Sequence, residues 1–408
     1  MACHDEPGML TVATCRERLL NTVVPLAGSE TVALAQAVGR VLADALSARM
    51  DSPPADNSAM DGYAVHADDL ASDAPLHLVG SSAAGHPWTG TLQPGESLRI
   101  LTGAVVPAGA SAVIMQEDIL REPADSTHIR LGRALSPGEN IRSRGEDIGA
   151  GDALLPAGRQ LTPADIGLLA SQGIASVSVR PRLRIALLST GDELVPPGQP
   201  LAPGQIHDSN RVMLQAALLQ AGFEVLDLGH VRDELDALRS RFADADRLAD
   251  AVITSGGVSV GDADLVRQVV GELGDIRVWK IAIKPGKPFA FGTLPNSLFF
   301  GLPGNPVSAL VTLEQLAMPA LRALQGTRWQ PAWTVSARLL GPVRKKPGRA
   351  EYQRGMLSQR DDGAFEVMPL AGQGSGLLTS LSRANCYLVL DQDQGRIDTG
   401  EPVRVQPF

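Results

Sequence analysis

The sequence predicts a multidomain α/β plus β protein with a central three-layer α/β domain whose sheet is mostly parallel. From residue 183 onward, apolar strands alternate with helical segments, a pattern typical of a parallel sheet covered by helices on both faces. Residues 65–135 and 335–390 contain short alternating apolar runs between glycine and proline turns, which indicates β domains. A chain of 408 residues is too long for one hydrophobic core, so we expect about three or four domains.

Composition narrows the class of protein. With 44% hydrophobic and 20% charged residues, the chain has the composition of a soluble globular protein. Its formal net charge of -9 argues against general nucleic-acid binding. Cys3, Cys15 and Cys386 are too far apart in sequence to suggest a disulfide framework or a zinc site. We find no signal-peptide pattern and no stretch of about 18 apolar residues, so we expect a cytoplasmic protein without a membrane segment.

The N-terminal region reads as a helical scaffold. Apolar residues recur at helical spacing from residue 11 to about 48, with Gly39 as an interruption. Prolines 53 and 54 end this pattern, and the polar loop 56–65 follows.

Three loops in the first half of the chain carry chemistry-bearing side chains. Asp61 lies in the loop 56–65, Thr102 precedes a glycine at a strand end, and Asp147 lies beside two arginines in residues 140–148. Each loop also has an ordinary structural explanation, either as a turn stabilised by its own side chains or as an exposed salt-bridged turn. From the residues alone we favour the turn for the loops of Asp61 and Thr102, and the segment around Asp147 is undecided.

The α/β region places its loops where ligands bind in such folds. We expect strands over residues 183–188, 223–228 and 251–253 and helices over 212–221, capped by Asn210, and 234–245. Ligands of parallel sheets bind at the carboxyl ends of the strands. The segments Ser189-Thr190-Gly191-Asp192-Glu193 and Thr254-Ser255-Gly256-Gly257 both fall there.

The loop after residue 253 offers both halves of a metal-phosphate site. Gly256 and Gly257 allow backbone N–H groups to approach an anion, and Asp262 and Asp264 are suitable ligands for a hard cation. A plain strand connection is the alternative.

Lysines and a helix start add anion-binding groups. If residues 278–284 form one strand, Lys280, Ala282 and Lys284 share a face, and Lys287 follows beyond a Pro-Gly turn. We favour phosphate binding over a solvated edge strand. Asn305 fits the N-cap and Pro306 the first position of a long helix, whose free N–H groups attract anions.

The C-terminal region predicts a small β domain. Its candidate strands are residues 335–339, 366–369 and 387–390, and Asp362-Gly363 is a hairpin turn. A basic stretch at residues 344–354 and the glycine-rich loop 372–376, which contains Ser375, are explained by solvation or by a shared site.

Together, the motifs resemble the molybdopterin molybdenumtransferase (MoeA) family, which is related to the gephyrin C-terminal domain. The segments that carry the resemblance, in order, are residues 56–64, 189–194, 255–264, 284–288 and 302–308. The resemblance implies an elongated homodimer of four-domain chains. The implied domains are a scaffold domain (1–50 and 138–182), an inserted β-rich domain (51–137), an α/β molybdopterin-binding-like domain (183–328) and a C-terminal β-barrel-like domain (329–408).

The resemblance also implies a reaction and its residues. In this family molybdenum is transferred from molybdate to adenylylated molybdopterin with Mg²⁺, releasing AMP and molybdenum cofactor. The implied catalytic positions are Asp61, Thr102, Asp147, Glu193, Asp264, Lys280 and Lys284. The implied cofactor-binding positions are Gly256, Gly257, Ser259, Lys287, Pro303, Gly304, Asn305, Pro306 and Ser375. The metal ligands would be Glu193, Asp264 and Asp233.

The sequence departs from the family pattern at three positions, and two other functions are compatible with the fold. Ala55, His207 and Leu265 stand where aromatic residues are frequent in the family, which affects packing around the pocket more than its charged positions. A non-catalytic scaffold protein of the same fold and a molybdopterin adenylyltransferase are the alternative functions. As partners we expect a second copy of the chain, a molybdopterin adenylyltransferase and downstream cofactor-handling proteins, and neither nucleic acid nor membrane.

Overall fold

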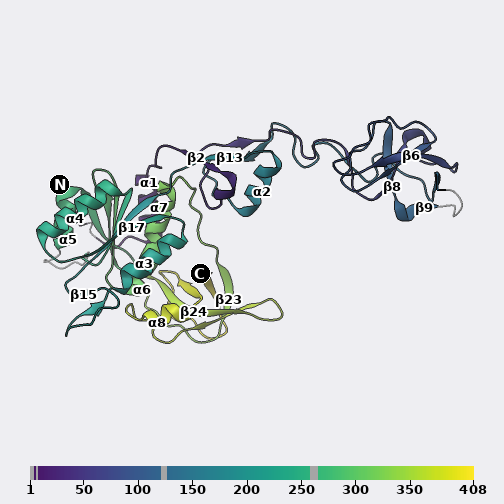
Figure 1. Cartoon of the computed structure of the whole chain (residues 1–408). Coiled ribbons are helices and arrows are strands. Elements are labelled where there is room, and N and C mark those ends of the chain that lie inside the picture. The colour runs from purple at the N-terminus through teal and green to yellow at the C-terminus, as the bar shows by residue number, and fades with distance from the viewer. Residues whose placement is uncertain (1–3, 6–7, 121–125, 258–264) are drawn as a thin grey trace. The chain divides into compact units, whose positions relative to one another are not determined.

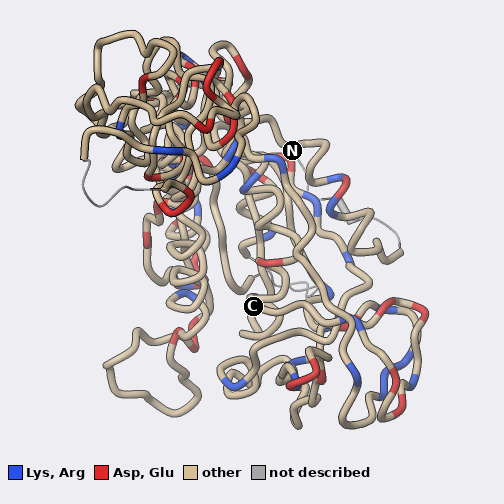
Figure 2. Tube along the Cα trace, turned by 90° about the vertical axis from the view of Figure 1, so that its right-hand side faces the viewer, with Lys and Arg blue, Asp and Glu red and all other residues tan. Residues whose placement is uncertain are grey.

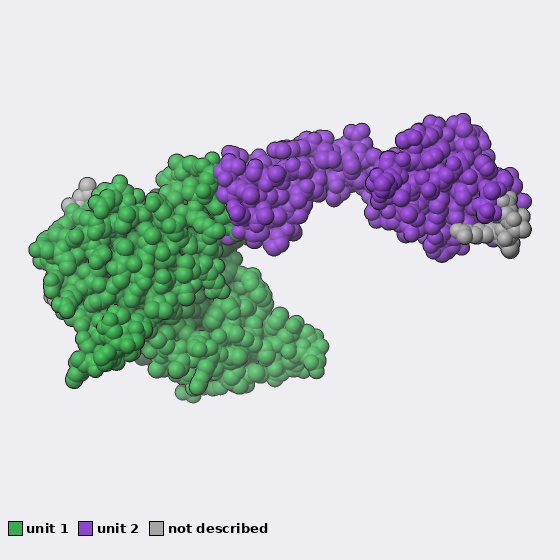
Figure 3. Space-filling view, viewed as in Figure 1, with its two compact units in different colours: residues 1–30, 39–41, 180–408 green, residues 31–38, 42–179 purple. Residues whose placement is uncertain are grey.

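The computed structural model describes residues 4–5, 8–120, 126–257 and 265–408. The chain divides into two compact units (Figure 3), unit 1 with residues 1–30, 39–41 and 180–408, and unit 2 with residues 31–38 and 42–179. Acidic and basic residues are interspersed along the chain trace (Figure 2).

The centre of unit 1 is a seven-stranded sheet of order β1-β19-β21-β22-β18-β14-β17 (Figure 1). Its strands are β1 (His4–Asp5), β14 (Arg184–Thr190), β17 (Glu224–Val231), β18 (Ala251–Ser255), β19 (Asp275–Lys280), β21 (Pro288–Thr293) and β22 (Leu298–Leu302). Strands β17, β14, β18 and β22 run parallel, while β21 is antiparallel to both of its neighbours. The predicted strands of the α/β region are confirmed.

Helices cover both faces of this sheet, as the alternation of strand residues requires. Ile185 and Leu187 face the core beneath α1 (Val12–Thr22), α3 (Ser209–Gln220) and the helix that begins at Pro306. Ala186 and Leu188 face the core beneath α4 (Leu235–Leu248) and α5 (Leu265–Leu273). The three-layer architecture is therefore confirmed.

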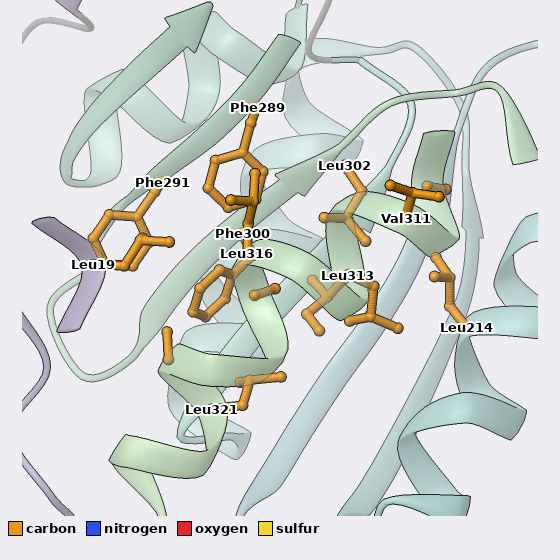
Figure 4. Packing of buried hydrophobic residues seen from close by; sticks show 14 of the residues in the cluster. Leu19, Leu214, Phe289, Phe291, Phe300, Leu302, Val311, Leu313, Leu316 and Leu321 are labelled. Atoms are coloured by element: carbon orange, nitrogen blue, oxygen red, sulfur yellow. The ribbon is translucent and has the colours of Figure 1, made fainter. Parts of the chain in front are cut away.

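The helix that begins at Pro306 is the most buried of these. It comprises α6 (Pro306–Thr312), a π-helical turn η4 (Leu313–Ala317) and α7 (Met318–Leu324). Figure 4 shows its leucines packed against phenylalanines of the sheet. By length and composition alone Pro306–Leu324 could cross a membrane, although it contains Glu314 and Arg322, and 72% of its most apolar window is buried. Packing in the core accounts for its composition.

The C-terminal part of unit 1 is a closed five-stranded barrel. Its strands are β23 (Val335–Leu339), β24 (Ala350–Gln359), β25 (Phe365–Pro369), β26 (Cys386–Leu390) and β27 (Pro402–Pro407). The order β24-β25-β23-β27-β26 closes because β26 also pairs with β24. The short strand β20 (Ile283–Lys284) adds to β24 from outside the barrel. The three strands predicted in this region and the turn at Asp362-Gly363 are confirmed.

Unit 2 contains a six-stranded sheet of order β8-β5-β7-β6-β10-β9. Its strands are β5 (Gly62–His66), β6 (Leu76–Ser82), β7 (Glu96–Ile100), β8 (Ala110–Met115), β9 (Ile119–Leu120) and β10 (His128–Leu131). The remaining elements include α2 (Pro163–Ser171), which begins at a capping box of Thr162 and Asp165. The multidomain α/β plus β fold class is thus confirmed.

The predicted helix over residues 33–45 is wrong. That segment contains only the 3-10 turn η1 (Leu34–Gln36), and Gly39 has a φ of 76°, outside the helical region. The Leu42 N–H donates to the carbonyl of Arg159, and Leu42 bridges Val179. These contacts with distant backbone take the place of local helical hydrogen bonds despite the apolar spacing.

Candidate active site

A cavity of about 660 Å³ lies at the carboxyl ends of the parallel strands of unit 1. This volume is within the range of about 300–1,000 Å³ that is usual for small-molecule sites. One wall comes from the loops after β14, β17, β18 and β22, and the other from the barrel. Of the predicted site residues, those that line it are Glu193, Asp233, Gly256, Gly257, Lys284, Lys287, Pro303, Gly304, Asn305 and Ser375.

Backbone forms the floor of the cavity at Gly256 and Gly257. Their φ angles are 96° and 65°, in the left-handed region that favours glycine. A Cβ at residue 257 would lie 2.3 Å from Val266 Cγ2, and one at residue 256 would lie 2.7 Å from the Thr190 carbonyl oxygen. Side chains larger than hydrogen do not fit at either position.

A buried hydroxyl points to a ligand. Thr190 ends β14, lines the cavity and is 3% exposed. Its Oγ1 is buried and has no hydrogen-bond partner among the described residues. Because an unsatisfied buried hydroxyl is costly, a ligand that accepts or donates a hydrogen bond here would be stabilised.

The start of α6 forms part of the cavity wall, as predicted. Asn305 is the N-cap and makes no side-chain capping bond, and Pro306 occupies the first turn without lining the cavity. The Val307 N–H donates to the carbonyl of Ser375 at 2.9 Å, so the loop 372–376 takes one of the free N–H groups of the helix.

The loop 372–376 is held by Arg354, a buried arginine at the end of the basic stretch 344–354. Arg354 is 1% exposed, and its guanidinium donates to the Gly374 carbonyl at 3.0 Å and the Gly372 carbonyl at 3.3 Å. Gln373 in the same loop lines the cavity. The glycine-rich loop and the basic stretch are both visible in the sequence, but the burial of Arg354 against the loop is not.

Carboxylates gather at one side of the cavity. Glu193 and Asp233 line it. Burial raises the pKa of Asp233, and the negative charges of Asp192 and Glu193 raise it further, while His230 acts in the opposite direction. Like charges gathered at a partly buried place form a suitable environment for a cation.

The third predicted metal ligand, Asp264, lies outside the described residues, as does Ser259. Among the residues that the structure describes, no group of three or more His, Cys, Asp and Glu side chains is placed to hold a metal ion.

The predicted lysine strand is wrong. Lys280 ends β19 and does not line the cavity, whereas Lys284 belongs to β20 and pairs with the barrel. Between them, the Ala282 N–H donates to the Leu10 carbonyl at 2.7 Å. The chain therefore changes partners within four residues, and Lys280, Ala282 and Lys284 do not share one strand face.

The predicted cap of α3 is also corrected. Asp208 is the N-cap and accepts from the Arg211 N–H, because Asp208-Ser209-Asn210 offers three competing caps. Asn210 instead donates from Nδ2 to Ser255 Oγ at 2.9 Å and to the Gly304 carbonyl at 2.7 Å. It joins the ends of β18 and β22 beneath the cavity wall.

The three remaining predicted site residues, Asp61, Thr102 and Asp147, belong to unit 2. Asp61 Oδ1 accepts hydrogen bonds from Thr102 N and Thr102 Oγ1, both at 2.7 Å, so these two residues are brought together. Those bonds lower the pKa of Asp61. Asp147 is exposed, and its N–H donates to the Ser52 carbonyl.

Comparisons with known proteins cover almost the whole chain. Residues 10–173 match the MoeA N-terminal region (domain I and II), residues 186–323 a probable molybdopterin binding domain, and residues 336–408 the MoeA C-terminal region (domain IV). A molybdopterin molybdenumtransferase of Haemophilus influenzae is 43% identical over 98% of this chain and 99% of its own length. The chain belongs to the molybdopterin molybdenumtransferase family. The resemblance inferred from the motifs is thereby confirmed.

Other members of the molybdopterin molybdenumtransferase family agree in extent and fold. A Nostoc relative of the same name is 39% identical over 92% of this chain and 88% of its own length. A crystal structure of a molybdopterin biosynthesis MoeA protein from Pyrococcus horikoshii is 28% identical with a TM-score of 0.84, covering 98% of this chain and all of that chain.

Proposed function

We propose that this protein is a molybdopterin molybdenumtransferase that transfers molybdenum from molybdate to adenylylated molybdopterin with Mg²⁺, releasing AMP and molybdenum cofactor. The observation that carries the proposal is the cavity of unit 1, where a glycine cradle, a helix start, two lysines and two carboxylates meet. This chemistry suits a phosphate-containing substrate, and the chain is 43% identical to a relative named for this activity.

The phosphate end of the substrate is assigned to the basic and backbone groups. Lys284 and Lys287 supply ammonium donors, and Gly256 and Gly257 let backbone come close to the phosphates. The Thr190 hydroxyl, which lacks a partner among the described residues, is assigned to a polar atom of the same substrate. Molybdate, the second substrate, is itself an anion and is expected on the basic rather than the acidic side.

The carboxylates fit a magnesium ion. Mg²⁺ is usually held by one or two protein carboxylates together with substrate phosphates, which matches the donor set of Glu193 and Asp233. Burial and the negative charges of Asp192 and Glu193 raise the pKa of Asp233, and a bound cation would relieve the repulsion. When bound, Mg²⁺ would neutralise charge on the phosphoanhydride. Glu193 and Asp233 would also orient water near it.

The test is AMP release from purified adenylylated molybdopterin, combined with calorimetric titration with and without Mg²⁺ and molybdate. We expect AMP release only when both are present, and a strong loss for Glu193→Gln. A protein that binds neither AMP nor the adenylylated pterin would instead be a scaffold of this fold. Adenylylation of molybdopterin with ATP would instead identify an adenylyltransferase.

We also propose, from the family resemblance, that the protein is a cytoplasmic homodimer that exchanges substrate and product with a molybdopterin adenylyltransferase and with downstream cofactor-handling proteins. Sedimentation equilibrium of the purified chain tests the dimer: a mass near 42.8 kDa at micromolar concentration would refute it.

A further inference from the structure

A buried acid of the barrel contacts a lysine of the cavity. Glu351 in β24 is 4% exposed, and its Oε1 lies 3.1 Å from the Nζ of Lys284, whose side chain is 44% exposed and lines the cavity. The second oxygen of Glu351 accepts from Gln353 Nε2 at 2.8 Å. Both carboxylate oxygens are therefore occupied, one by the lysine and one by a neutral amide.

The polar residues of β24 form a row on one face of the strand. Residues 351, 353 and 355 share that face because side chains alternate along a strand. A Cβ at Gly355 would contact Leu388 and Val367 in the barrel core, so this face is the inner one. Glu351 and Gln353 thus occupy the barrel interior at the end nearest the cavity.

The backbone connects the same elements. Lys284 is the register partner of Glu351, and the Ala350 N–H donates to the Ala282 carbonyl at 2.8 Å. The Ile281 N–H donates to the Lys287 carbonyl, which closes the loop that carries both cavity lysines. The position of this loop therefore depends on the barrel strand as well as on the α/β domain.

Stability alone does not explain an acid at this place. Burying a carboxylate is costly, and replacing a buried ion pair by apolar residues is often neutral or stabilising. A lysine with one N–H engaged by Glu351 still has two donors for a ligand anion. We propose that Glu351 is a positioning residue that fixes the Lys284 ammonium toward the substrate, with Gln353 orienting the carboxylate. This inference rests on the proposed function.

The first experiment compares Glu351→Gln with Glu366→Gln. Glu366 lies in β25 of the same barrel, is paired with Arg338 and Arg360 on its surface, and does not line the cavity, which makes it a matched control. We expect Glu351→Gln to lower kcat for AMP release about 10-fold with a KM within about 3-fold, because the ammonium is misplaced rather than lost. The control should retain wild-type values. Wild-type kcat in Glu351→Gln would overturn the inference.

The second experiment asks whether Glu351 acts through Lys284. In a Lys284→Gln background, adding Glu351→Gln should change single-turnover AMP release by less than about 2-fold, since its target is gone. Lys284→Gln alone should lower the melting temperature by leaving a buried carboxylate without its ion pair, and the double variant should recover it. Fully additive effects on both readouts would refute the positioning role. An inactive wild-type protein would refute the proposed function instead, whereas the melting-temperature comparison would still test the pair.

Discussion

The predicted site residues of the unit 1 cavity and the Asp61–Thr102 pair of unit 2 differ in how the surrounding structure holds them. Around the cavity, residues far apart in sequence are joined by hydrogen bonds, such as those of Asn210 to the buried Ser255 and to Gly304. The Asp61–Thr102 pair is exposed and depends on two hydrogen bonds between neighbouring loops. We therefore expect substitutions that disturb the cavity backbone to alter both fold and function, and substitutions at the pair to leave the fold intact.

The strongest test of this difference is Gly257→Ala. The new Cβ would meet Val266 Cγ2 at 2.3 Å in a backbone with a φ of 65°. We expect a loss of about 3 kcal/mol in unfolding free energy, from the left-handed backbone and overpacking together. AMP release should fall by at least about 100-fold because the phosphate cradle moves. Denaturant unfolding and AMP assays measure the two effects.

Gly222→Ala is the matched control. Its φ is 88° and no atom of the described residues lies within 4 Å of the place that a Cβ would occupy, so the substitution strains the backbone without a clash. It should cost about 1 kcal/mol and leave AMP release unchanged. Equal losses in both variants would show that the contact with Val266 is unimportant.

A buried carboxyl group, Glu314, makes the stability of the fold depend on pH. Burial raises the pKa of Glu314, in the π-helical turn, to about 7 from an ordinary value of 4.5, and Tyr387 acts in the opposite direction. The folded state holds the Glu314 proton up to a higher pH than the unfolded state does. The contribution of Glu314 to stability therefore falls as pH rises from 4.5 to 7. The unfolding free energy lost over this pH interval is about 3 kcal/mol. The lowered pKa of Asp61 has the opposite sign, so its contribution is lost only as pH falls below its ordinary value of 3.8.

Urea unfolding between about pH 4.5 and 8 measures the slope. Glu314→Gln should flatten it over this interval, whereas Glu17→Gln, on the exposed side of α1, should leave it unchanged. An unaltered slope in Glu314→Gln would mean that this carboxyl titrates like an exposed one.

The features that can be predicted from sequence depend on local signals. Gly256 and Gly257 follow an apolar run at the end of a strand, and Asn305-Pro306 is a helix start by cap preference alone. Alternation of strands and helices is enough to predict that these segments meet at one sheet edge. Ser375 is located through the family resemblance rather than through its own chemistry.

The features that sequence misses depend on distant backbone. A period of two places Lys280 and Lys284 on one strand face, yet Leu10 and β24 draw the chain into two separate pairings. The cap preference of Asn210 is misleading because its actual targets, Ser255 and Gly304, are remote in sequence. No local sequence pattern predicts which distant loop a side chain contacts.

A smaller effect is expected from Thr190→Val. Removing the hydroxyl, which has no partner among the described residues, should keep the unfolding free energy within about 1 kcal/mol of wild type or raise it. The affinity for adenylylated molybdopterin should fall about 5-fold. Thr254→Val is the control, because its Oγ1 is likewise buried and unpartnered among the described residues but does not line the cavity. Calorimetric titration should separate them. Equal affinity of both variants for adenylylated molybdopterin would show that Thr190 does not contact this substrate.

The smallest effect is expected at the exposed pair of unit 2. Thr102→Val removes the hydroxyl donor to Asp61 but keeps the backbone N–H, which is the larger cause of the lowered pKa. The pKa of Asp61 should rise part of the way to its ordinary value, and the melting temperature should stay unchanged because both residues are exposed. Carbon-detected NMR titration of the Asp61 carboxyl measures the shift. A lower melting temperature would show that this pair, like the cavity, serves the fold, and the contrast between the two regions would fail.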